Sequence, residues 1–436
     1  MTDINLTEFQ SQEIIESLKS GIPNISAVSY INVDIAARKL WFDDIVNNLE
    51  NFIKKGGSKV RFINGQYGNG KTHLLSMIKH KAKELNYAVS YVNAEDIKLS
   101  RYDELYKGII KYLETKDNKD NVFKILIEKF SLKIKQDVEK QFDDSDDQSE
   151  YHKEIKRKIK DFLSKLTKCS ANFQSALKNY MINYIEAPNE KDWENENETI
   201  LRWFSGEKLP LKEIRAFQIY ALNDKDNARE SIKAVIDILK NIGYSGLVIL
   251  VDEAERILSQ SPTVSKNAYN NIRHILDSAD GGGEINHAES CYIFIASTPE
   301  MLDDKKGYKS YPALYDRIKQ GLASKTFENL INPRANIVDL EKDEAQVQEE
   351  NLIEIMDKII KIHSIAYDWI PPEKIISKRS IKELAKKSYN IRSQMAPLRA
   401  TVKMMVEILD IAQSHPSFEP NDYILKPDTQ EIKLWD

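Results

Sequence analysis

Two spacings of apolar residues alternate along the first hundred positions of the chain. Residues 59–64 and 88–93 are short, largely apolar runs bounded by turn-forming residues, which is typical of strands. Between them, over residues 71–85, apolar side chains recur every three or four positions and indicate an amphipathic helix. A loop with three glycines at residues 65–70 joins the first strand to this helix. The order strand, loop, helix, strand predicts a βαβ unit and therefore a parallel sheet.

Helices are predicted ahead of this unit, over residues 7–19 and about 34–54. In the second of them, the apolar face is expected to consist of Leu40, Ile45, Leu49 and Phe52. Further along, residues 247–251 and 291–296 are uninterrupted apolar runs, as in strands that are buried on both faces.

A charged, mostly helical region separates the two pairs of strands. Five acidic residues lie between positions 143 and 150, and seven Lys or Arg residues lie in a predicted amphipathic helix at 153–168. Its apolar face is expected to consist of Ile155, Ile159, Phe162, Leu163 and Leu166. The acidic stretch 186–198 contains Pro188 and is predicted to be a loop.

These patterns predict an α/β fold, in which a parallel sheet has helices on both faces, a long helical insertion and a C-terminal helical lid. The expected parts are an N-terminal helical segment (1–55), the first part of the core (56–114), the charged helical insertion (115–240), the remainder of the core (241–335), and the lid with its tail (336–436).

Composition narrows the class of protein. The 436 residues include 63 Lys and Arg against 68 Asp and Glu, so the net charge of −5 excludes a uniformly basic nucleic-acid coat. Only 15 glycines and 13 prolines argue against an all-β fold. The two cysteines, Cys169 and Cys291, form no scaffold, and neither a secretory leader nor a membrane-spanning run is evident. We therefore expect a cytoplasmic protein without a membrane partner.

The loop sequence GQYGNGKT at residues 65–72 matches G-x-x-x-x-G-K-[ST]. Glycines allow successive backbone N–H groups to face phosphate oxygens, and the helix that follows directs its positive end at the same anion. In this motif the lysine, here Lys71, reaches the β- and γ-phosphates, while the hydroxyl of Thr72 ligates Mg²⁺. The predicted nucleotide contacts are Gly65, Gln66, Tyr67, Gly68, Asn69, Gly70, Lys71, Thr72 and His73.

Two acids end the strand at 247–251. Asp252 is predicted to hold the Mg²⁺ shell, and Glu253 to accept a proton from the attacking water. The next apolar strand ends in Ser297 and Thr298, whose hydroxyls could contact that water or the γ-phosphate, although a strand-ending turn also explains them.

Arginines could complete such a site. Arg317, or alternatively Arg334, is a candidate to reach the γ-phosphate in a neighbouring subunit, although a surface ion pair explains Arg317 equally well. Arg399 is a candidate to contact the nucleotide from the helical lid, with a plain surface arginine as the alternative.

The order of these features is that of an AAA+ ATPase, and the chain further resembles the BREX-system ATP-binding proteins of the BrxD type. The resemblance spans most of residues 8–412, and it is carried by residues 14–23 (IIESLKSGIP), 62–75 (FINGQYGNGKTHLL), 251–255 (VDEAE) and 312–318 (PALYDRI). It implies an origin-recognition-like AAA+ fold and a place in anti-phage defence operons. The family has a Gly-Arg pair on the adenine side, whereas residues 32–38 (NVDIAAR) lack the glycine, and Leu398 separates Pro397 from Arg399 in the lid.

The expected activity is Mg²⁺-dependent hydrolysis of ATP to ADP and phosphate, coupled to engagement of DNA or of a defence partner such as a helicase, nuclease or methyltransferase. An arginine acting in trans predicts a homo-oligomer on ATP binding. The alternative is a nucleotide-gated switch that hydrolyses slowly and recruits an effector. The basic side of the helix at 153–168 could contact DNA phosphates, but a solvated helix face or a protein-binding surface explains it as well.

Overall fold

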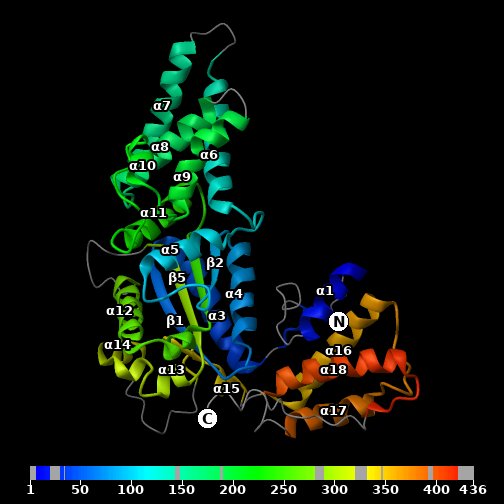
Figure 1. Cartoon of the computed structure of the whole chain (residues 1–436). Coiled ribbons are helices and arrows are strands. Elements are labelled where there is room, and N and C mark those ends of the chain that lie inside the picture. Colours follow the sequence, from blue (N-terminus) through cyan, green and yellow to red (C-terminus); the bar gives the residue numbers. More distant parts are fainter. Residues whose placement is uncertain are drawn as a thin grey trace.

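The computed structural model has an α/β core with a helical insertion beyond one edge of its sheet and a separate helical bundle beside the other (Figure 1). It describes residues 6–19, 30–33, 35–142, 148–186, 190–279, 289–319, 331–344, 347–390 and 396–420.

Within the described residues, the core contains one sheet of six strands in the order β3-β2-β4-β5-β1-β6. The strands are β1 (Ser58–Asn64), β2 (Ala88–Asn93), β3 (Leu113–Glu114), β4 (Leu247–Asp252), β5 (Cys291–Ser297) and β6 (Ile337–Asp339). All neighbours pair in parallel except β2 and β3. The predicted α/β fold with a parallel sheet is therefore confirmed. The strands β3 and β6 were not predicted, because two or three residues are too few to show an alternating pattern.

Helices cover both faces of the sheet because each central strand buries both of its sides. In β4, Val248 and Leu250 belong to a core shared with α3 (Ala36–Asn51) and α4 (Lys71–Glu84). Ile249 and Val251 point the other way, into a core shared with α5 (Tyr102–Lys111), α11 (Ala228–Asn241) and α12 (Pro262–Ala279). This period of two is the geometry of a strand, and it explains why the apolar run had no polar side.

The buried face of α3 differs from the predicted one. Ala37, Trp41, Ile45 and Leu49 are buried at a spacing of four, whereas the side chains of Leu40 and Phe52 remain 49% and 47% exposed. The helix therefore packs against the sheet through its i, i+4 ridge, which these four residues form. Leu40 and Phe52 are apolar but lie off this ridge.

The two edges of the sheet serve different parts of the molecule. Asn64 lies opposite Ser297, and Asn93 lies opposite Asp252, so the carboxyl ends of β1, β5, β2 and β4 meet at one edge. The helix α4 begins at this edge. The insertion instead returns to the core at the other edge, where α11 leads to Leu247, the first residue of β4 (Figure 1).

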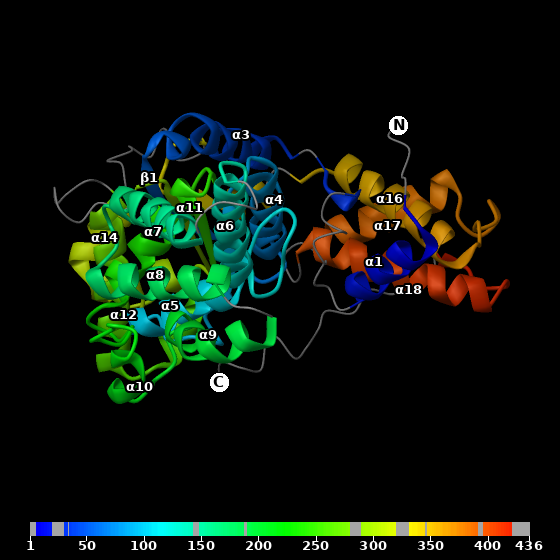
Figure 2. The ribbon, with the colours of Figure 1, turned by 90° about the horizontal axis from the view of Figure 1, so that it is seen from above.

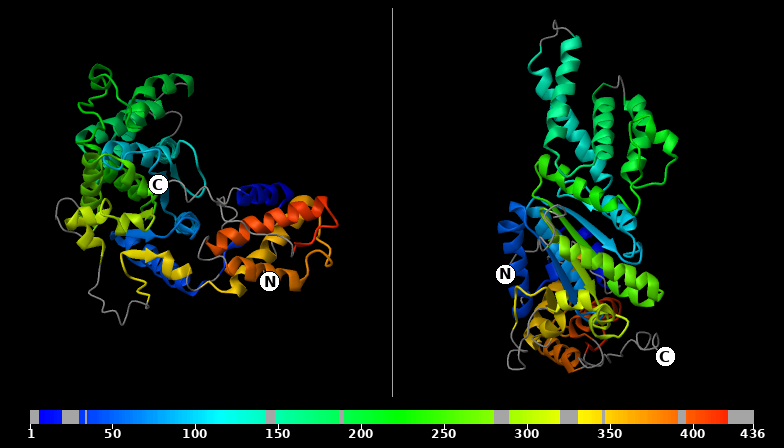
Figure 3. Two further views of the ribbon diagram at one scale, coloured as in Figure 1. Left: turned by 60° about the horizontal axis from the view of Figure 1, so that its bottom comes forward. Right: turned by 90° about the vertical axis from the view of Figure 1, so that its left-hand side faces the viewer.

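The insertion consists of α6 (Val122–Glu139), α7 (Gln148–Lys165), α8 (Ala171–Glu186), α9 (Glu190–Phe204) and α10 (Leu211–Arg215), and it projects away from the sheet (Figure 3). The apolar face predicted within residues 153–168 is buried as expected. Of the acidic block before it, residues 143–147 lie outside the described part of the chain.

The loop prediction for residues 186–198 is wrong, because α8 continues to Glu186 and α9 begins at Glu190. The C-terminal turn of α9 buries Ile200, Trp203 and Phe204 in the insertion core, and Asn197 donates a hydrogen bond to the carbonyl of Tyr180 (3.3 Å). Tertiary packing of this end holds the acidic segment in a helix that its composition did not indicate.

The bundle joins the two ends of the described chain. The helix α1 (Glu8–Lys19) packs against α16 (Glu349–Tyr367) and α18 (Pro397–Ser414), with α17 (Lys378–Asn390) completing the group (Figure 2). Ile14 and Leu18 share one core with Met356 and Leu409. No helix among the described residues combines the length and the apolarity needed to cross a bilayer.

A buried ion pair fastens α3 to the sheet, and it gives a test of the packing. The guanidinium of Arg61 in β1 is 1% exposed; it contacts the Asp44 carboxylate and donates to the carbonyl of Pro333 at 2.9 Å. Asp44→Asn leaves this charge buried without its counter-ion, so we expect a loss of about 3 kcal/mol in the free energy of unfolding, measured by urea denaturation. Asp43→Asn, at the exposed neighbouring position, is the control and should change it by less than ~0.5 kcal/mol. Equal effects of both variants would contradict this account.

Candidate functional site

The glycine-rich loop crosses from β1 to α4 at the carboxyl edge of the sheet. Gly68 and Gly70 have φ angles of 90° and 87°, a region that side chains disfavour. A Cβ on Gly68 would also lie 3.0 Å from the Cβ of Ala396. Lys71, the first residue of α4, donates hydrogen bonds from Nζ to the carbonyls of Gly65 (2.7 Å) and Gln66 (3.2 Å). Burial lowers the pKa of this ammonium, and the carboxylates of nearby acids partly oppose that shift.

A carboxylate that was not predicted from the sequence forms hydrogen bonds with the glycine-rich loop. Glu341, in α15 (Leu340–Glu344), accepts hydrogen bonds on Oε1 from the backbone N–H of Gln66 (2.7 Å) and from Nδ2 of Asn69 (2.8 Å). Because α15 follows β6 and precedes the bundle helix α16, this contact connects the loop to the segment between core and bundle. Only its position in the fold identifies Glu341, since it belongs to no motif.

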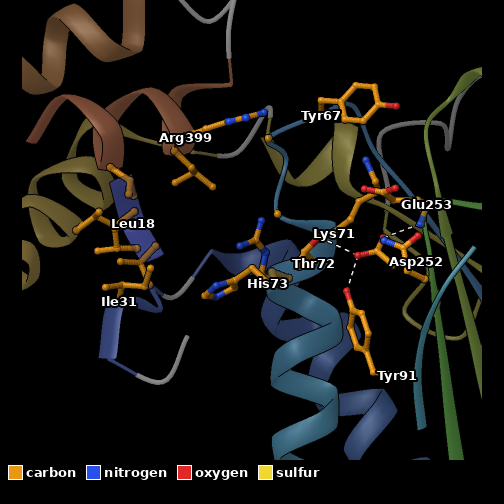
Figure 4. A pocket seen from close by; sticks show the side chains of 18 of the residues that line it. Leu18, Ile31, Tyr67, Lys71, Thr72, His73, Tyr91, Asp252, Glu253 and Arg399 are labelled. Carbon is orange, nitrogen blue, oxygen red and sulfur yellow. Dashed lines mark hydrogen bonds between the residues drawn. The ribbon is translucent and has the colours of Figure 1, made fainter. Parts of the chain in front are cut away.

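Asp252 is the centre of a compact hydrogen-bond network (Figure 4). Its Oδ2 accepts hydrogen bonds from the hydroxyls of Thr72 (2.9 Å) and Tyr91 (2.5 Å), and its Oδ1 accepts one from the backbone N–H of Glu253 (2.9 Å). Asp252 is 4% exposed, and these three hydrogen bonds fix the orientation of its buried carboxylate. The pattern predicted Thr72 and Asp252, but it gave no signal for Tyr91.

Glu253 and Glu255 follow Asp252 at the start of η2 (Ala254–Ser259). Glu253 has a left-handed φ of 57°, and its Oε2 lies 3.5 Å from Nε of Arg256. Glu255 is buried beside the loop, and this burial raises the pKa of its carboxyl group, although the charge of Lys71 opposes the shift. The sequence prediction included Glu253 but omitted Glu255.

These groups line a single pocket of about 520 Å³, within the usual size range of ligand sites. One end is polar and contains the glycine-rich loop together with Asp252 and Glu253. The other end is apolar and is formed by side chains from α1, residues 30–33, α16 and α18 (Figure 4). The apolar residues are Leu18, Ile31, Val33, Ile355, Leu398 and Val402.

Two residues from the loop's surroundings lie between these ends. Arg38 is 5% exposed and donates from Nη2 to the carbonyl of Asn69 at 3.2 Å. His73 lies on α4, with Nε2 at 3.2 Å from Oδ1 of Asn32. Burial, reinforced by the charge of Arg38, lowers the pKa of His73 to about 3, so its ring is neutral at pH 7.

Of the remaining predicted residues, one lines the pocket and the others do not. Arg399 lines the pocket and extends from α18 toward the loop, where its Cδ would lie 3.0 Å from a Cβ on Gly68 (Figure 4). Thr298 is buried and does not line the pocket. Arg317, in α14 (Pro312–Ile318), lies away from the pocket, with its Nε 2.8 Å from Asp277 of α12. The side chain of Arg334 is 84% exposed.

The donor set at the polar end fits Mg²⁺ held together with phosphates. Thr72 directs its hydroxyl proton to Asp252, which leaves the oxygen lone pairs available, and both residues offer the oxygen ligands that Mg²⁺ prefers. Within the described residues, no three His, Cys, Asp or Glu side chains form a metal site by themselves.

In a comparison with family models, residues 6–427 match the family described as BREX system ATP-binding protein BrxC/D. The chain belongs to this family. The resemblance noted from the motifs is thereby confirmed, and the family description supports ATP as the ligand and anti-phage defence as the setting. Neither the curated proteins nor the solved structures contain a match to the chain.

The contact of Glu341 gives a test of how the loop is held. Glu341→Ala removes the acceptor of the Gln66 N–H, and a hydrogen bond to a charged group contributes about 1.5–3 kcal/mol. Hydrogen exchange in a peptide covering residues 65–70 should therefore become at least about tenfold faster. Glu350→Ala, at an exposed position in α16, is the control and should leave that exchange unchanged. Unchanged exchange in Glu341→Ala would show that the loop holds its shape without this contact.

Proposed function

We propose that the chain is a Mg²⁺-dependent ATPase that converts ATP to ADP and phosphate and couples its nucleotide state to a partner in anti-phage defence. The observation that carries the proposal is the pocket itself, in which the glycine-rich loop and the Asp252–Glu253 pair face an apolar wall of the bundle. A triphosphate suits the first end and a purine base suits the second.

At the phosphate end, Lys71 changes partners when a nucleotide binds. Its ammonium now donates to two loop carbonyls, and the β- and γ-phosphate oxygens offer stronger, charged acceptors nearby. Thr72 and Asp252 would hold Mg²⁺, directly and through its water shell. Bound there, Mg²⁺ would neutralise charge on the phosphates. The loop N–H groups and the N-terminus of α4 stabilise the same charge.

Glu253 is the proposed base that orients the attacking water and accepts its proton. Its carboxylate lines the pocket next to Asp252, and its Oε2 has no hydrogen-bond donor among the described residues. The same oxygen lies 3.5 Å from Nε of Arg256, and a carboxylate at this place could take the proton of an attacking water. Thr298 was expected to contact that water or the γ-phosphate through its hydroxyl, but it does not line the pocket.

The base end explains how adenine could bind without the family's Gly-Arg pair. Side chains of α1, α16 and α18 form the apolar wall, and these helices share one core, so the bundle closes on the base as a unit. Arg399 would contact the phosphates from the same bundle. Nucleotide binding and loss would then shift the bundle relative to the core.

Other features support an AAA+ type of mechanism. The strand β5 lies between β1 and β4, so the Ser297–Thr298 end lies between the loop and Asp252. Arg317 and Arg334 lie on the surface away from the pocket of their own chain, which agrees with an arginine that acts on a neighbouring subunit and with ATP-dependent homo-oligomerisation. The ion pair of Arg317 with Asp277 would have to open for such a role.

The arginines that line the pocket favour the second candidate, a slow switch. Within the described residues of one chain, Arg38 and Arg399 are the arginines that line the pocket, and both belong to the nucleotide-binding surface. A monomer would then bind ATP, hydrolyse it slowly, and present the bundle or the insertion to an effector. DNA remains a candidate partner through the lysine-rich side of α7.

Phosphate release from ATP, measured with and without duplex DNA while light scattering follows particle size, separates these candidates. We expect turnover by the wild type, at least ~100-fold less by Glu253→Gln, and an ATP-dependent larger species of that variant. Glu95→Gln, at an exposed acid that also pairs with Arg256, is the matched control and should keep turnover. Tight ATP binding without turnover by either the wild type or Glu253→Gln would support the switch instead.

The assignment of the base end can be tested by filling it. Val402→Trp puts a large ring into the apolar end, so we expect the affinity for ATP to fall by at least ~10-fold while that for inorganic tripolyphosphate stays within about twofold. Gln413→Trp, at an exposed position of the same helix, should change neither affinity in calorimetry. Equal losses for both ligands in Val402→Trp would place the base elsewhere.

A further inference from the structure

Tyr91 belongs to no motif, yet its hydroxyl donates to the same oxygen of Asp252 that accepts the Thr72 hydroxyl (Figure 4). It lies on β2, two residues before Asn93, which is the register partner of Asp252 in β4. The neighbouring strand therefore supplies a hydroxyl at the place where the predicted metal-binding acid ends its own strand. Tyr91 also lines the pocket.

The ring of Tyr91 is itself held in place. Lys79 lies further along α4, and its Nζ is 5.7 Å from the ring centroid of Tyr91. That ammonium is paired with Glu114 of β3 at 2.5 Å. A cation over the ring and a carboxylate behind the cation restrict how far the phenol can move. The direction of the Tyr91 hydroxyl toward Asp252 is thus set before any ligand arrives.

The three donors on Asp252 are not equivalent. The N–H of Glu253 is fixed by the backbone, and Thr72 must also offer its hydroxyl oxygen to Mg²⁺ in the proposed function. Tyr91 is a side-chain donor to this carboxylate that does not also have to offer its oxygen to Mg²⁺. A buried carboxylate that loses a donor turns toward another one, because an unmet hydrogen bond is costly there.

We propose that Tyr91 is a positioning residue that holds the Asp252 carboxylate, through its Oδ2, in the orientation required for Mg²⁺, and so sets the Mg²⁺ dependence of nucleotide binding. The proposal rests on the proposed function, since it concerns the same site. It assigns to β2 a part in metal binding that the loop and the Asp-Glu pair do not supply. Mutation of a residue that orients a metal ligand through a hydrogen bond typically lowers metal affinity by about tenfold or more.

The test measures binding rather than turnover. The affinity of full-length protein for the non-hydrolysed analogue AMP-PNP is determined by calorimetry in EDTA and across a Mg²⁺ titration. For Tyr91→Phe we expect wild-type affinity in EDTA, within about twofold, and a Mg²⁺ half-saturation concentration raised roughly tenfold. In an Asp252→Asn background, Tyr91→Phe should have no further effect, because the two residues act as one unit.

Tyr87→Phe is the matched control. Tyr87 directly precedes β2, and its buried hydroxyl donates to the carbonyl of Leu49 at 2.6 Å; neither residue lines the pocket. It should lower the melting temperature without changing the Mg²⁺ titration. The proposal is overturned if Tyr91→Phe behaves in the same way, or if it weakens binding equally in EDTA. Failure of the wild type to bind the analogue at all would overturn the proposed function and this inference together, whereas wild-type binding with an unchanged titration in Tyr91→Phe overturns only the role of Tyr91.

Discussion

The hydrogen bond between Thr72 and Asp252 joins residues 180 positions apart, and the site depends on it. It requires that α4 begin and β4 end at the same edge of one sheet. Parallel pairing of β4 with β5, and of β5 with the strand β1 that leads into the loop and α4, meets this requirement, because parallel strands bring their carboxyl ends together. The loop, the acids and Tyr91 all take their positions from that edge. The proposed nucleotide pocket is thus a consequence of sheet topology before it is a consequence of any one side chain.

The pocket is completed by parts of the chain that lie outside the sheet. The apolar end comes from both termini of the described chain, since α1 packs with α16 and α18 in one core. Glu341 and Arg399 bring the segment after β6 and the bundle to the glycine-rich loop. These contacts give a physical route by which filling the pocket could alter the position of the bundle.

The insertion is placed differently. It returns to the core at the amino edge of the sheet, opposite the pocket, and its aromatic cluster of Phe173, Trp203 and Phe204 continues the core on one face of the sheet. A partner bound there would not touch the nucleotide. The lysine-rich side of α7 and the bundle are therefore two separate surfaces. Of the two, only the bundle lines the pocket.

The sequence by itself determined the elements whose signal is local. The loop at residues 65–72, the apolar strands and the helix α4 follow from backbone freedom of glycine and from the spacing of apolar side chains, and these predicted the α/β core. Membership of the family could be inferred from the same motifs. Tertiary structure alone decided what depends on residues distant in the chain. The short strands β3 and β6 form only by pairing with neighbours, and α9 is helical because its end is buried. Tyr91, Glu255 and Glu341 reach the site through strand register and helix packing, which a linear pattern does not encode because each contact is set by segments that meet only in the folded chain.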